Sequence, residues 1–217
     1  YYKNGFNGLI NFDFKGDAQQ PYEQTFAKYS KILHNDLKGY TVMNYISSHD
    51  DDWPFDKKRE KPYESATKLL LTPGISQIYY GDETARPLQI PKAEGDANLR
   101  GLMNWDDIEN NPETQKILQY WQALGKFRAA HPAVGAGIHQ MISSKPYYFT
   151  RTYSDGHFTD KVLIGLDLGK GEKVISVKTI FEDGSRLRDA FSGKKAKVKN
   201  GSVAFDTENT TVLIEKL

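Results

Sequence analysis

The chain has 217 residues, with 29 Lys and Arg against 28 Asp and Glu, and a length suited to one large or two modest globular domains. The formal net charge of +1 gives neither the basic surplus of a nucleic-acid-binding protein nor an acidic solvating tail. The absence of cysteine excludes disulfides, thiolate chemistry and cysteine–zinc sites, and no apolar run approaches the ~20 residues of a membrane span. The first residues have no signal-peptide pattern, and we expect a chain that is entered in the middle of a fold.

The first part of the chain alternates between strand-like and helix-like segments. Short apolar stretches bounded by turn residues predict strands at 8–14, 41–47 and 75–80. Apolar residues at spacings of three and four predict helices at 20–36, from Pro62 and from Pro112. Alternation of this kind implies a parallel sheet with helices packed outside it. Because three strands cannot close an eight-stranded barrel, we expect the last portion of a (β/α)8 barrel.

After His131-Pro132 the pattern changes to short strands separated by turn residues such as Asp155-Gly156 and Asn200-Gly201. The expected strands are 137–142, 147–153, 161–168, 173–180, 195–199, 202–205 and 210–215. Seven or eight short strands at this spacing predict an antiparallel β-sandwich. The expected fold class is therefore α/β followed by all-β, with the barrel part at 1–134 and the sandwich at 135–217.

Polar and acidic residues follow each of the three expected parallel strands, where the active site of an α/β barrel lies. Asn11 and Asp13 end the first, the run from His49 to Asp52 ends the second, and Asp82-Glu83 ends the third. This is the pattern of a carboxylate-lined pocket. Glycosidases need such groups, because one carboxyl protonates the leaving oxygen and another attacks or activates water.

Each of these features alone also has a structural explanation. The acidic run from Asp50 to Asp52 is compatible with a solvated loop, and a lone His49 with a hydrogen-bonded structural histidine. Asp50, Asp52 and Asp56 do not follow the spacing of a calcium loop, and the required turn glycine is missing. Gly169-Lys170-Gly171 is a hairpin turn without the spacing of a phosphate loop.

Together, several segments resemble the α-amylase family. Residues 45–50, which end in Ser48-His49-Asp50, resemble its seventh-strand motif, in a form that leans toward bacterial periplasmic α-amylases. Residues 73–83 resemble its eighth-strand motif, with Ser76 where the motif has proline. Further similarities are found at 8–14 with the sixth strand, at 100–105 with the loop after the eighth strand, at 124–132 with the last barrel helix, and in the tail with the C-terminal sandwich. The order and spacing of these motifs cover essentially the whole chain.

The resemblance implies a retaining hydrolase that cleaves α-1,4-glucosidic bonds in starch or maltooligosaccharides. Asp50 matches the family's third catalytic carboxylate, which binds sugar hydroxyls and stabilises the distorted transition state. His49 matches its substrate-binding histidine. Asp51, Trp53 and Arg59 belong to a loop that commonly lines sugar subsites, and the Trp53 indole is suited to stacking on a ring.

The resemblance also implies that the nucleophile, its partner arginine and the acid/base glutamate lie upstream of Tyr1. We therefore expect this chain alone to be inactive, as the C-terminal portion of a longer enzyme. No cofactor is evident in this chain, and calcium stays an open possibility for the full-length enzyme. The implied location is periplasmic or extracellular, and the exposed edges of a partial barrel would permit self-association.

Two other readings stay open at the level of sequence. One is a non-catalytic module that binds carbohydrate or supports a neighbouring domain, in which the aromatics of the sandwich contact glucan. The other is a transglycosylase or α-1,6-glucosidase of the same superfamily. Neither reading includes a nucleic-acid or membrane partner.

Overall fold

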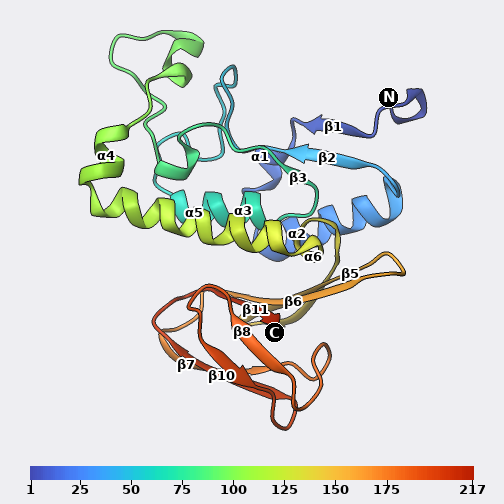
Figure 1. The fold of residues 1–217 in the computed structure, drawn as a ribbon. Coiled ribbons are helices and arrows are strands. Elements are labelled where there is room, and N and C mark those ends of the chain that lie inside the picture. Colours follow the sequence, from blue (N-terminus) through green and yellow to red (C-terminus); the bar gives the residue numbers. More distant parts are fainter. The chain divides into compact units, whose positions relative to one another are not determined.

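In the computed structural model, which describes residues 1–217, the chain divides within one long helix into two units, Tyr1–Lys126 and Phe127–Leu217 (Figure 1). This helix, α5, spans Pro112–Ala130. No helix combines the length and the apolar character needed to cross a membrane.

The first unit is built on a parallel sheet of three strands, β1 (Gly8–Asn11), β2 (Thr41–Asn44) and β3 (Ile75–Ser76), in that spatial order. Helix α2 (Tyr22–Lys31), with a π-helical turn at Ile32–Asp36, connects β1 to β2. Helix α3 (Pro62–Leu71) connects β2 to β3. The expected alternation of strands and helices, and the parallel sheet that it implies, are therefore present in this unit.

Helices α2, α3 and α5 lie along one side of this sheet (Figure 1). Phe26 and Tyr29 of α2, Leu69 of α3 and Leu124 of α5 are buried. These residues recur at helical spacing, so their apolar surface is removed from water when the helices pack, which stabilises the fold by roughly 25 cal/mol per Å². Pro62 occupies the start of α3, where its missing N–H costs no hydrogen bond.

Asn44 joins all three strands through its side chain. Its Oδ1 atom accepts a hydrogen bond from Asn11 of β1 at 2.8 Å, and its Nδ2 atom donates to the carbonyl of Pro73, before β3, at 3.0 Å. Asn44 is fully buried, and Asn11 lies beside it in register. Because an unpaired buried amide is costly, these bonds favour one alignment of the strands.

The three strands are shorter than the sequence predicts. Residues 12–14, 45–47 and 77–80 were expected in strands, and these expectations are wrong. Phe14 begins helix α1 (Phe14–Asp17), and the other two segments are not strands, although the Gln77 amide still donates to the Asn44 carbonyl at 2.8 Å. The carbonyl of Ile46 instead accepts a hydrogen bond from the Phe55 amide at 2.8 Å, so a following loop satisfies the backbone there. The long loop after β3 contains the short helix α4 (Trp105–Asn110).

The second unit begins at the end of α5 with α6 (Pro132–Ala136) and contains eight strands. They are β4 (Ile138–Ser144), β5 (Tyr147–Ser154), β6 (Thr159–Leu166), β7 (Gly171–Ser176), β8 (Arg186–Asp189), β9 (Lys195–Lys197), β10 (Ser202–Thr207) and β11 (Val212–Lys216). All pairings are antiparallel, in a six-stranded sheet of order β4-β5-β6-β11-β8-β9 and a two-stranded sheet of β10 and β7. The expected antiparallel arrangement is present.

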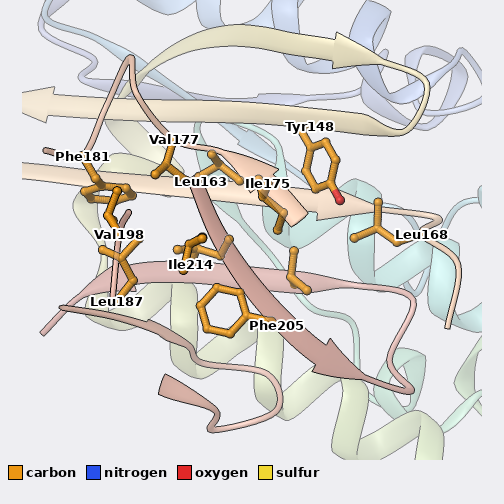
Figure 2. Packing of buried hydrophobic residues seen from close by; sticks show 12 residues of the cluster. Tyr148, Leu163, Leu168, Ile175, Val177, Phe181, Leu187, Val198, Phe205 and Ile214 are labelled. Atoms are coloured by element: carbon orange, nitrogen blue, oxygen red, sulfur yellow. The ribbon is translucent and has the colours of Figure 1, made fainter. Parts of the chain in front are cut away.

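A buried hydrophobic cluster joins the two sheets (Figure 2). The six-stranded sheet contributes residues such as Leu163, Leu187 and Ile214, and the two-stranded sheet contributes Ile175 and Phe205. Along β7 and β10 buried and exposed residues alternate, as expected when one face of a sheet packs on a core.

His131, at the start of the second unit, is held between two carboxylates. Its Nδ1 atom lies 2.9 Å from an oxygen of Asp160 on β6, and its Nε2 atom lies 2.5 Å from an oxygen of Glu215 on β11. The second Asp160 oxygen accepts a hydrogen bond from the Ala133 amide at the start of α6. These contacts fasten the chain that enters the unit to two neighbouring strands of its larger sheet.

Removing two methyl groups from the cluster should destabilise the second unit. We expect Val203→Ala to lower the free energy of unfolding by about 2 kcal/mol, because the buried side chain leaves a cavity. Val174 on the paired strand is 68% exposed, so Val174→Ala is a matched control with an expected change under about 0.5 kcal/mol. Urea titrations read by amide hydrogen exchange in β7 and β10 measure both changes. Equal losses would contradict the assignment of this cluster as the core.

Candidate active site

His49 and Asp50 lie side by side in the segment that follows β2. The His49 Nε2 atom is 3.7 Å from Asp50 Oδ2, and the Ser48 hydroxyl donates to Asp50 Oδ1 at 2.9 Å. The two side chains are 62% and 61% exposed, although Ser47 and Ser48 just before them are buried. The backbone is thus anchored directly beside an imidazole and a carboxylate that are both open to a ligand.

Asp51 turns back toward the protein. One of its carboxylate oxygens forms an ion pair with Lys15 and accepts a hydrogen bond from the Tyr45 hydroxyl at 3.2 Å, while the other accepts one from the Trp53 amide at 2.9 Å. Burial lowers the pKa of Lys15, and the negative charge of Asp50 opposes this shift. The sequence did not point to these two partners of Asp51. Lys15 is far from Asp51 along the chain, and Tyr45 was expected to be an ordinary strand residue.

The indole of Trp53 is 82% exposed in the same loop. Phe12, also exposed, has its ring at a right angle to the Tyr45 ring with the centroids 6.2 Å apart. Exposed aromatic faces of this kind are suited to packing against the apolar face of a sugar ring.

Arg59, the remaining residue expected at a sugar subsite, is almost entirely enclosed. Its guanidinium lies 2.9 Å from the Oδ1 atom of Asp82, its Nε atom donates to the Arg86 carbonyl at 2.8 Å, and its side chain is only 9% exposed. The Ser47 hydroxyl donates to the same Asp82 oxygen at 2.6 Å. Burial raises the pKa of Asp82, while the charge of Arg59 and the hydrogen bond from Ser47 act against the rise.

The acidic residues that were expected together at the strand ends therefore have different environments. Asp50 is open to solvent, Asp82 is buried in an ion pair, and Glu83 accepts a hydrogen bond from the Gly81 amide within its own turn. The Asn11 side chain is taken up by structural hydrogen bonds, to Asn44 on the neighbouring strand and to the Tyr29 hydroxyl. Nowhere in residues 1–217 are three or more His, Asp or Glu side chains grouped as a metal site would require.

Arg86 fastens the loop after β3 from inside the first unit. Its guanidinium donates to the carbonyls of Tyr80, Leu99 and Gly101, and it stacks on the Tyr80 ring with the carbon of the guanidinium 4.2 Å from the centroid. From this loop, Arg100 Nε donates to the His49 carbonyl at 3.0 Å. The loop is thereby joined to the segment that carries His49 and Asp50.

The proteins similar to this chain include several alpha-amylases, and among the solved structures also a debranching enzyme and a cyclomaltodextrin glucanotransferase. No protein-family model matches the chain. It is 35% identical over 168 residues to the periplasmic alpha-amylase of Escherichia coli (strain K12). The aligned region covers 76% of this chain and 23% of that protein. Among solved structures, the alpha-amylase of Geobacillus thermoleovorans, complexed with acarbose, has a TM-score of 0.66 and 17% identity over 99% of this chain and 49% of that chain. The alpha-amylase of H. orenii has a TM-score of 0.61 and 21% identity over 100% of this chain and 50% of that chain.

The chain therefore spans about a quarter of the curated relative and about half of each of these solved structures. At the identities of the two solved structures, their likeness establishes a shared fold.

The turn at Gly81 should tolerate no side chain. Its φ is 87°, and an added Cβ would stand 2.5 Å from the Cβ and Nε atoms of Arg86. We expect Gly81→Ala to lower the free energy of unfolding by about 3 kcal/mol, since left-handed strain and the displacement of Arg86 add together.

Gly39→Ala is the matched control in the same unit. Gly39 has a φ of 88° but no atom within 4 Å of an added Cβ, so only backbone strain of about 1 kcal/mol is expected. Thermal unfolding read by tryptophan fluorescence reports on this unit, which contains Trp53, Trp105 and Trp121. Similar losses for both variants would show that the close approach of Arg86 has no energetic weight.

Proposed function

Because the chain is related to the α-amylases and spans a part of them, we propose that it is the C-terminal portion of an enzyme that cleaves α-1,4-glucosidic bonds in starch or maltooligosaccharides with retention of configuration. The observation that carries the proposal is the exposed pair of His49 and Asp50 just beyond the carboxyl end of β2. The acarbose complex of the solved relative supports an oligosaccharide as the ligand. The name of the curated relative supports a periplasmic or extracellular location.

In this proposal Asp50 stabilises the positive charge that develops on the sugar in an oxocarbenium-like transition state. The hydrogen bond from Ser48 holds one oxygen of Asp50 and leaves the other free for a sugar hydroxyl. His49 binds a neighbouring hydroxyl, and Trp53 packs on a ring face. Direct sugar contacts of Asp51 and Arg59 stay predictions, since both side chains already have protein partners.

The reaction also needs a nucleophile and an acid/base, whose carboxyl groups lie about 5–5.5 Å apart in retaining enzymes. We propose that both come from a preceding part of the enzyme. Support comes from the sheet itself, in which the apolar residues Ile10 and Ile75 are both in register with Met43 and are exposed. An apolar sheet face with open edges at β1 and β3 is what further strands of a barrel would cover.

Removing the charge of Asp50 tests its assigned role. In the complete enzyme, Asp50→Asn should lower kcat by about 1,000-fold or more with an unchanged circular dichroism spectrum, because the exposed carboxylate contributes to the transition state rather than to the fold. Asp52→Asn is the matched control, since Asp52 is exposed in the same loop. Steady-state hydrolysis of maltooligosaccharides measures both. Near-normal turnover of Asp50→Asn would overturn the assignment.

The 217-residue chain on its own should show no hydrolysis of maltooligosaccharides above a buffer blank, because it would carry only one of the three catalytic carboxylates. Product release is measured by a reducing-end assay. The protein concentration is chosen so that a kcat of about one ten-thousandth of a typical value would be detected. Measurable hydrolysis that Asp50→Asn abolishes would contradict the proposed division of the site. Saturable glucan binding without any upstream catalytic part would favour a non-catalytic module.

A further inference from the structure

A buried ion pair is connected to the segment that carries the exposed His49 and Asp50. Asp82 is fully buried, and its Oδ1 atom accepts a hydrogen bond from the Ser47 hydroxyl at 2.6 Å and lies 2.9 Å from the guanidinium of Arg59. These residues come from two segments that flank the site, the segment that follows β2 and the turn after β3. A single carboxylate oxygen therefore ties the start and the end of the loop that carries His49, Asp50 and Trp53.

Stability alone is a weak reason for such a pair. The desolvation of two charges offsets most of their attraction, and an apolar pair of similar volume often serves the fold equally well. In contrast, the hydrogen bonds from the Ser47 hydroxyl to Asp82 and from Arg59 Nε to the Arg86 carbonyl have fixed directions and specify one geometry, which packed methyl groups do not. The enclosure of Arg59 also leaves little of its guanidinium for a sugar.

Two short chains of contacts lead from this pair to the exposed residues. On one side, Ser47 is followed by Ser48, whose hydroxyl donates to Asp50 Oδ1 at 2.9 Å. On the other side, Arg59 Nε donates to the Arg86 carbonyl at 2.8 Å. The Arg86 side chain holds the loop from which Arg100 Nε donates to the His49 carbonyl at 3.0 Å.

We propose that Ser47, Arg59 and Asp82 form a positioning unit that fixes the orientation of Asp50 and His49 toward the substrate. The proposal rests on the proposed function, because it acts through Asp50. Ser47 and Asp82 are buried and act without contact with the substrate. Their contribution is to hold the carboxylate of Asp50 in the geometry that the transition state requires, where a displacement of about 1 Å can cost about 100-fold in rate.

The first variant for the test is Ser47→Ala, because Asp82→Asn would leave the buried guanidinium of Arg59 without its charge partner and could prevent folding. Ser47→Ala removes one hydroxyl and keeps the ion pair. Its matched control is Ser65→Ala on α3, since the Ser65 hydroxyl is buried in the same unit without a hydrogen-bond partner. The same atoms are removed from both sites, and only one site leads to Asp50.

In the complete enzyme we expect Ser47→Ala to lower kcat on maltooligosaccharides by about 10- to 100-fold per folded molecule, with KM changed by no more than about 2-fold. Ser65→Ala should leave both constants within about 2-fold of the wild type. The fraction of folded enzyme comes from thermal unfolding, so a merely structural role would move Tm and leave kcat per folded molecule unchanged. An unchanged kcat for Ser47→Ala would overturn the proposal.

A double-mutant cycle with Asp50→Asn separates this proposal from the proposed function. If Ser47 acts through Asp50, Ser47→Ala should change kcat by less than about 2-fold once Asp50 is Asn, because the group to be positioned has lost its charge. Losses that multiply in the double variant would overturn the positioning role while leaving the role of Asp50 intact. A normal kcat for Asp50→Asn alone would overturn both the proposed function and this inference.

Discussion

The side chain of Asn44 is the interaction on which the first unit depends. It lies in the middle strand, accepts from Asn11 on one side and donates to the chain entering β3 on the other, all within a buried environment. A slip of one residue in either pairing would turn a buried amide away from its partners and send each strand's side chains to the opposite face. The direction in which the chain leaves β2, and hence the placement of His49 and Asp50, follows from that alignment.

Two aspartates that follow neighbouring strands differ in their availability to a ligand because only one of them is buried. Asp50 remains in water, where a carboxylate is available to a ligand, whereas Asp82 is enclosed and kept in place by Ser47 and Arg59. The buried acid and the exposed acid are linked by two hydrogen bonds, from the neighbouring hydroxyls of Ser47 and Ser48. In this arrangement the buried acid provides geometry and the exposed acid provides charge. This division resembles that of metal sites, in which residues behind the ligands orient them.

The sequence predicted the structure well where the spacing of apolar residues or a single turn decides the local fold. The helix from Pro62, the parallel order of the first three strands and the antiparallel strands after His131 follow from spacing and turn residues. The strand ends were predicted too long, because hydrogen bonds such as that from Phe55 to Ile46 come from distant loops. Strand β8 was not predicted, since its alternation offers a single apolar residue, Leu187, between two arginines. The pairing of Arg59 with Asp82 gave no sequence signal, because a charged residue in a loop reads as solvated.

The Arg86 guanidinium binds the loop after β3 through main-chain atoms of the loop, the carbonyls of Leu99 and Gly101. A carbonyl is present whatever the side chain, so this attachment does not depend on the identity of the residue between them. The exposed Leu102 can therefore be exchanged during evolution while the loop keeps its place, whereas the side chain of Arg100 also joins the loop to the His49 carbonyl. The backbone of this loop can thus be kept while its exposed side chains, which a new ligand would contact, change.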